Sequence, residues 1–251
     1  MKLQFFQTRP MIFTITSLFI VGAFLFISTM PSKSFSRMPN QNSSWERQIT
    51  VRNFTENLKV VNLEVARDGR HVRLTLRNNH SKTITAFTLG EDRRHSTIDL
   101  IDTDKVFAPG AERVEEYDLP QTQEPIIIIQ AVVFDDKSAE GNPEFIKKIT
   151  ESRLGEKTQL NLIIPLLESI LNAPDAQLGR ALETNQSRIL QLHDMPESGS
   201  LEFRYALKNA KRLVLHHLEE LKQTLQDEGT ERFRQYLLML KERYQRKSSI
   251  L

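Results

Sequence analysis

The sequence predicts an α+β protein in which an N-terminal transmembrane helix precedes an all-β sandwich and then an α-helical C-terminal region with a helical hairpin. Three observations predict this order. Residues 11–30 are apolar and uncharged, apolar and polar residues alternate between 58 and 134, and helical spacing begins after Gly141. The expected parts are a signal anchor (1–31), a flexible linker (32–57), the β-sandwich domain (58–141) and the helical region (142–251).

Composition excludes several classes of site. The chain has 251 residues, a net charge of +2 and no cysteine. The nearly balanced charge gives no indication of nucleic-acid binding or of an acidic substrate. Without cysteine there is no disulfide, no thiolate zinc site, no cysteine nucleophile and no lipid anchor on cysteine.

The apolar segment 11–30 predicts contact with a membrane. It exceeds the roughly 7–15 residues of a signal-peptide core and no A-x-A pattern comes after it, so a retained anchor is favoured over a cleaved signal peptide. Single anchors of this form export the C-terminal remainder of the chain, which predicts a single-pass protein of the cell membrane with most of its residues in the periplasm. Lys33 and Arg37 nearly balance Lys2 and Arg9, so the opposite orientation stays open.

The segment after the anchor predicts a spacer. Residues 31–47 are rich in Ser, Asn, Pro and Gln, a composition that cannot bury an apolar core. Trp45, the only tryptophan, either packs on the next domain or lies at the membrane interface.

About six strands are expected in the β-domain, at the spacing of a β-sandwich. Residues 58–65 and 72–76 predict a hairpin, with Asp68 and Gly69 in its turn. The run 126–134 is apolar at nearly every position and predicts a central strand buried on both faces. The remaining expected strands are 83–89, 96–101 and 112–119.

A family resemblance rests on turn motifs in this region. The segments LTLRNNHSKTITAF (residues 74–87), APG (108–110) and VVFDDKSAEGN (132–142) resemble uncharacterised exported, membrane-anchored bacterial proteins with an immunoglobulin-like or fibronectin-like sandwich. The resemblance covers at most residues 58–142. It implies an immunoglobulin-like β-sandwich and an exported location, and it implies no activity, cofactor or site residue.

Helices are expected from Asn142 onward. The sequence NPE at residues 142–144 is a strong helix start, and Gly155 is the expected stop. Residues 158–171 contain Pro165 and predict a kinked or restarted helix, with a final strand as the alternative. A further helix is expected within residues 174–196.

The clearest periodicity lies in the last third of the chain. Apolar residues recur in steps of three or four on either side of Gly229, which predicts two antiparallel helices that fold on each other or on a partner. The residues expected to contact a partner are Val214, His217, Leu221, Leu225, Phe233 and Leu237. If the helices cover each other, the contact surface moves to the sandwich edges, where β-augmentation is available.

Two groups of residues are candidate metal ligands. Asp135, Asp136 and Glu140 supply hard oxygens of the kind calcium takes, but without EF-hand spacing, and a solvated turn is the favoured interpretation. His216 and Glu220 lie one helical turn apart and would need ligands from another helix to hold zinc or copper. The favoured interpretation of the neighbouring His217 is a packed or interfacial histidine.

No catalytic motif is present in the sandwich or helical region. G-x-S-x-G, S-x-x-K and glycine-rich phosphate loops are all absent there. The sequence therefore predicts a non-catalytic, membrane-anchored envelope protein that needs no cofactor and acts by contact with another envelope protein or with itself. Two alternatives stay open: a metal-dependent or hydrolytic envelope enzyme, and a membrane-tethered cytosolic scaffold.

Overall fold

The computed structural model describes residues 49–66, 70–91, 94–101, 107–119, 125–193, 196 and 198–251. The predicted membrane anchor, Trp45 and the predicted turn at Asp68 and Gly69 lie outside these residues. Of the helices within them, none is long and apolar enough to cross a membrane.

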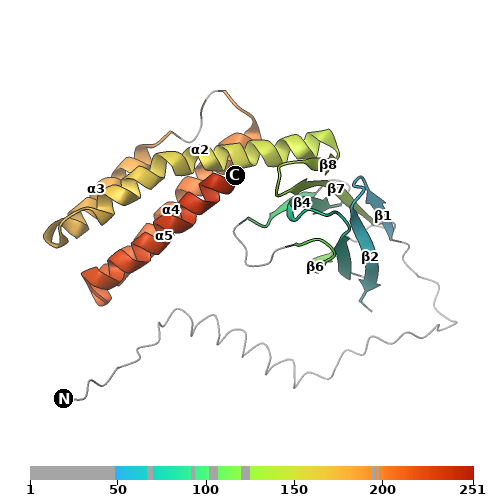
Figure 1. Cartoon of the computed structure of the whole chain (residues 1–251), viewed down its shortest axis with the longest axis horizontal. Coiled ribbons are helices and arrows are strands. Elements are labelled where there is room, and N and C mark those ends of the chain that lie inside the picture. Colours follow the sequence, from blue (N-terminus) through green and yellow to red (C-terminus); the bar gives the residue numbers. More distant parts are fainter. Residues whose placement is uncertain are drawn as a thin grey trace, which may run out of the picture. The chain divides into compact units, whose positions relative to one another are not determined.

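The α+β prediction is confirmed: two β-sheets are followed by four helices (Figure 1). One sheet has the order β1 (Thr50–Asn53), β7 (Ile126–Phe134), β4 (Ile84–Gly90) and β5 (His95–Asp99), with β8 (Ala139–Gly141) also paired to β7. The other has the order β2 (Leu58–Val65), β3 (His71–Asn78) and β6 (Glu112–Asp118). The helices are α2 (Pro143–Leu171), α3 (Leu178–Gln191) after the 3₁₀ turn η1 (Asp175–Gln177), α4 (Leu201–Asp227) and α5 (Thr230–Ile250).

All six predicted strands are present, and β2 and β3 form the predicted antiparallel pair. Two further strands were not predicted. Strand β1 lies inside the segment expected to be a linker, so that expectation is wrong at its C-terminal end. It pairs in parallel with β7, with Thr50 opposite Ile126. Its sequence, TVRN, has four residues and too little apolar alternation to predict a strand.

The predicted central strand is β7, and it is buried on both faces. On one face Ile127, Ile129 and Val132 join the core between the two sheets. On the other, Ala131 and Val133 contact α2. The alternation changes phase between Ile129 and Ala131 because a register shift against β4 leaves one extra residue in β7. A strand with two buried faces has no polar side, which explains the continuous apolar run.

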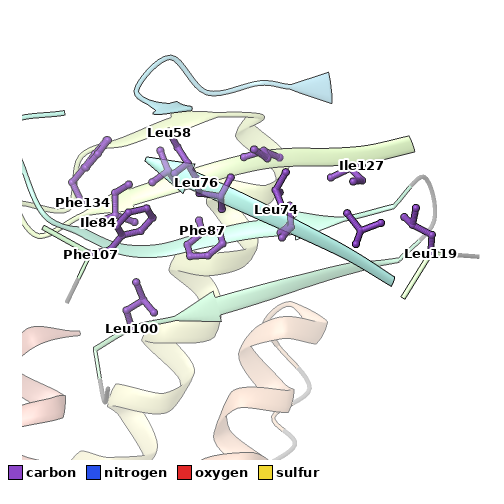
Figure 2. Close-up of a cluster of buried hydrophobic side chains, with 14 residues drawn as sticks. Leu58, Leu74, Leu76, Ile84, Phe87, Leu100, Phe107, Leu119, Ile127 and Phe134 are labelled. Carbon is purple, nitrogen blue, oxygen red and sulfur yellow. The ribbon is translucent and has the colours of Figure 1, made fainter. Parts of the chain in front are cut away.

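A single hydrophobic core joins the two sheets (Figure 2). Leu74 and Leu76 of β3 point toward Phe87 of β4, and Phe107 packs edge-on against Phe87 with ring centroids 6.2 Å apart. The opposite face of the β2–β3–β6 sheet is polar. There Arg73 forms an ion pair with Glu116 at 2.8 Å, as expected for a sheet with one solvated face.

Helix α2 corrects two expectations: it neither stops at Gly155 nor restarts at Pro165. A Cβ atom on Gly155 would lie 2.3 Å from the carbonyl oxygen of Phe203, so this glycine permits close packing against α4. Pro165 removes one backbone donor, so the carbonyl of Asn161, an exposed residue, loses its bond within the helix. The helix continues through both residues.

Helix α2 connects the sheet to the other helices (Figure 1). Its first half packs Ile149 against the β7 face that points away from the core between the two sheets. Arg153 fixes this contact, because its guanidinium donates to Asp99 Oδ2 at 2.9 Å and to the carbonyl of Thr85 at 3.0 Å. The second half of α2 contributes Ile163 and Leu167 to a core shared with α3, α4 and α5.

The predicted helical hairpin is present. Helix α4 ends at Asp227 and α5 begins at Thr230, with Gly229 between them at a φ of 87°. That φ lies in the left-handed region, which glycine adopts at little cost. The two helices meet along their length, since His217 Nδ1 and Tyr244 Oη are 2.6 Å apart.

Candidate functional site

A polar pocket lies where α2 and α4 cover the end of the larger sheet. Its volume is about 610 Å³. Strands β4 and β5, helix α2 and helix α4 all contribute to it. The lining residues are Thr88, His95, Thr97, Phe145, Lys148, Ser152, Glu202, Tyr205, Ala206 and Asn209.

The strand register forms one side of the pocket. Thr88 of β4 stands opposite Thr97 of β5, and their hydroxyl oxygens are 3.3 Å apart. His95 lies two residues before Thr97 and therefore on the same face of the sheet. Asp99, two residues further, is on this face as well and is held by Arg153. The strands thus supply hydroxyls and an imidazole on the face that α2 covers.

The first three turns of α2 form a second side. Asn142 caps the helix by accepting from the backbone N–H of Glu144 at 3.0 Å. Phe145, Lys148 and Ser152 then lie at helical spacing and share one face. Lys148 forms an ion pair with Glu144 at 2.6 Å, and its ammonium nitrogen lies 4.6 Å from the centroid of the Phe145 ring. The hydrogen bond from Lys148 lowers the pKa of Glu144 below its ordinary value.

The start of α4 forms the third side. Ser200 caps this helix by accepting from the backbone N–H of Phe203 at 3.1 Å. Glu202 in the first turn and Tyr205 and Asn209 beyond it line the pocket at helical spacing. This helix approaches α2 closely because Gly155 has no side chain.

The β5 strand also presents unpaired backbone groups next to the pocket. Within the described chain it pairs only with β4. The bond from Leu100 N to the carbonyl of Thr85, 2.8 Å, fixes which residues face β4. In an antiparallel pair, the backbone N–H and C=O groups of successive residues point alternately toward the partner strand and away from it. Those of Ser96 and Ile98 point toward β4, and those of Thr97 point away from it. Thr97 is an exposed residue, and no backbone partner of these two groups is found within the described chain.

The predicted acidic loop has a structural role in the described chain. Asp136 forms an ion pair with Lys82 at 2.5 Å and accepts from the backbone N–H of Ser138 at 3.0 Å. These hydrogen bonds, that of Lys82 first, hold the pKa of Asp136 well below its usual range. Glu140 accepts from the backbone N–H of Asn57 at 3.0 Å, and Asp135 is exposed.

The predicted histidine and carboxylate pair is on the surface of α4. His216 Nε2 and Glu220 Oε1 are 3.5 Å apart, and both side chains are mostly exposed. His217 instead turns inward to Tyr244. Across the residues that the structure describes, no three His, Asp or Glu side chains gather as metal ligands would.

The residues expected to contact a partner lie in the helical core instead. Val214, Leu221, Phe233 and Leu237 are buried, with Leu221 the most exposed of them at 5%. Leu225 packs against them, and His217 is half-buried. These side chains contact other helices of the same chain, so the expectation that they form a partner surface is corrected. This is the case for which the sequence moves the contact surface to the sheet edges.

Sequence reasoning missed the pocket. The stripes at Phe145, Lys148 and Ser152 and at Glu202 and Tyr205 are visible in the sequence as polar and aromatic residues at helical spacing. What the sequence does not reveal is that α4 returns to lie beside the start of α2. Comparison with family models, with curated proteins and with solved structures finds no match to this chain.

Proposed function

We propose that the chain is a membrane-anchored bacterial envelope protein that binds another protein at the β5 edge. In this proposal the two sheets are an immunoglobulin-like sandwich, residues 11–30 anchor the chain in the cell membrane, and the described part faces the periplasm. The observation that carries the proposal is the outward N–H and C=O of Thr97 beside the polar pocket. An edge strand of this kind can pair with an extended segment of a partner.

A photo-crosslinking experiment tests the binding role. A photoreactive amino acid replaces Thr97 in the full-length chain, and a second protein carries it at Val114. Val114 is 50% exposed on β6 in the other sheet and serves as the matched control. We expect a defined crosslinked product from position 97 and none from position 114. Equal crosslinking from both positions, or none from position 97, contradicts the proposal.

The proposed location has its own test, which uses the absence of cysteine. Ser249 is an exposed residue near the end of α5, and Ser249→Cys would introduce the only thiol in the protein. A membrane-impermeant maleimide added to intact spheroplasts should label the Ser249→Cys protein. Labelling only after lysis would favour the membrane-tethered cytosolic scaffold.

One observation favours the alternative of a hydrolytic enzyme: the pocket brings together an imidazole, a carboxylate and hydroxyls. Such groups serve as bases and nucleophiles when they converge. Hydrolysis of a panel of ester and amide substrates by the full-length protein, lost in both His95→Ala and Ser152→Ala, would support that function. Activity that survives both substitutions would contradict it at this site.

A further inference from the structure

We infer that the β5 edge and the pocket together bind an extended peptide that places a basic side chain, lysine or arginine, next to Glu202. This inference rests on the proposed function and assigns the chemical class of its partner. The backbone of the peptide pairs with Thr97, and the central side chain enters the pocket. The pairing, the charge of the pocket and its aromatic lining each support a part of this assignment.

The pairing directs the central side chain into the pocket. The N–H and C=O of Thr97 both point away from β4, so one residue of an added antiparallel strand can bond to both. The side chain of that residue lies on the same face of the sheet as the side chain of Thr97. Thr97 lines the pocket together with His95. The peptide side chain opposite Thr97 is therefore the one that the pocket receives.

The charge of the pocket favours a cation. The charge of Lys148 is balanced by an ion pair with Glu144 at 2.6 Å. The charge of the nearby Arg153 is balanced by an ion pair with Asp99 at 2.9 Å. Glu202 also lines the pocket, and among the described residues no cation pairs with it. A lysine or arginine from a partner would complete this set of ion pairs.

An aromatic ring adds to this preference. Tyr205 lies three residues after Glu202 on α4, so the two side chains share one helix face. The residue is 56% exposed, which leaves its ring accessible. A cation within about 6 Å of an aromatic centroid is attracted by the ring. Glu202 and Tyr205 can therefore contact the same ammonium or guanidinium group.

The length of β5 makes the pocket necessary. The strand has five residues, His95–Asp99, and Thr97 lies at its centre. So short an edge offers a peptide few backbone bonds, which give little affinity and no sequence preference. The side chain in the pocket must then supply most of the selectivity.

The test uses fluorescein-labelled pentapeptides of sequence Thr-Val-Xaa-Val-Thr, where the central residue is lysine, arginine, norleucine or glutamate. Binding to the full-length protein in detergent is measured by fluorescence anisotropy. The lysine and arginine peptides should bind about fivefold to tenfold more tightly than the norleucine peptide, and the glutamate peptide most weakly. A lysine peptide that is N-methylated at its central residue lacks the donor for Thr97 and should lose binding.

Two protein variants assign the preference to Glu202. Glu202→Gln should reduce the preference for lysine over norleucine to within about twofold. Glu231→Gln is the matched control, because Glu231 is likewise an acidic residue in the first turn of its helix, α5. It should keep the full preference. An unchanged preference in Glu202→Gln overturns the inference.

The outcomes separate this inference from the proposed function. If all four peptides bind equally and N-methylation weakens binding, the basic preference is wrong and pairing at β5 stands. If no peptide binds, or if N-methylation has no effect, pairing at β5 is wrong as well.

Discussion

Gly155 and Gly179 are two helical glycines in opposite surroundings. Gly155 in α2 is buried, and a Cβ there would lie 2.3 Å from the carbonyl oxygen of Phe203. Around Gly179 in α3, no described atom outside its own helix backbone and its two chain neighbours lies within 4 Å of the corresponding position. Helix propensity alone favours alanine at both sites by about 0.5–1 kcal/mol. The difference between the two substitutions therefore isolates the contact between α2 and α4.

We expect Gly155→Ala to lower the free energy of unfolding by about 1–3 kcal/mol, because the added methyl group pushes two helix backbones apart. Gly179→Ala should leave it unchanged or raise it by up to about 1 kcal/mol. Urea unfolding followed by circular dichroism measures both. Equal effects of the two substitutions would contradict the close approach of α2 and α4.

Asp136 predicts a pH dependence of stability. Its pKa is lower in the folded chain than the ordinary value of 3.8 because Lys82 and Ser138 donate to the carboxylate. A lowered pKa stabilises the folded state at pH values above the ordinary pKa, and this contribution is lost as the pH falls from about 4 toward the folded pKa. Asp136→Asn should therefore lower the melting temperature at pH 7 and have a smaller effect at pH 3.

The neighbouring carboxylate provides the control for this measurement. Asp135 is exposed, and no side-chain contact of its carboxylate is found within the described chain. Asp135→Asn should shift the melting temperature little at either pH. A loss for Asp136→Asn that is the same at pH 7 and pH 3 would show that the ion pair with Lys82 is not the cause.

Among the elements, the α4–α5 hairpin has its apolar stripe covered within the chain. Leu221 is 5% exposed and packs among α2, α3 and α5 residues, whereas Leu238 on the outer face of α5 is 44% exposed. Leu221→Ala should lower the free energy of unfolding by about 2–4 kcal/mol, and Leu238→Ala by less than about 1 kcal/mol. Thermal and urea unfolding of the two proteins measure the difference. A folded Leu221→Ala protein of unchanged stability would restore this stripe as a partner surface.

The sequence predicted elements where the local pattern is also what tertiary packing requires. Alternation predicted β2 and β3, and helical spacing around Gly229 predicted α4 and α5. Prediction from the sequence failed where the local structure depends on a residue that is distant in the sequence. In the sequence alone Gly155 predicts a helix stop, whereas in the structure it lies within the helix and allows the close approach of Phe203. Strand β1 is too short to have a pattern and depends on pairing with β7.

The candidate site was the least predictable part for the same reason. Lys148 and Glu202 are 54 residues apart in the sequence, and only the packing of α4 beside α2 brings both to one pocket. The acidic loop and the histidines were candidate sites because their residues are neighbours in sequence. In the structure Asp136 pairs with Lys82 and His217 contacts Tyr244, whereas Asp135, His216 and Glu220 are exposed.

For the whole described chain, Arg153 is a polar connection between the sheet and the helices. Its side chain is 11% exposed and bonds to both Asp99 and the carbonyl of Thr85. Arg153→Gln should lower the free energy of unfolding by about 1–3 kcal/mol, since the Thr85 carbonyl and Asp99 lose a charged donor. Urea unfolding measures the loss.

A double-mutant cycle separates the two bonds of Arg153. Asp99→Asn alone should lower the free energy of unfolding by less than Arg153→Gln does, because Asp99 is partly exposed and its ion pair is screened. The double variant should be less destabilised than the sum of the single variants, because both remove the same ion pair. Strict additivity would mean that the ion pair contributes nothing.

Helix α2 also fixes the angle between its side that faces the sheet and its side that faces α4. Ile149 faces the sheet and Gly155 faces α4, and the angle between these directions is fixed because the two residues are six positions apart in one helix. One residue inserted between them would turn the rest of the helix by about 100° and advance it by about 1.5 Å. Loop insertions elsewhere leave this angle unchanged. Length changes within this segment are therefore expected to keep this angle only when they add close to a whole number of turns, for example about seven residues, which make nearly two turns.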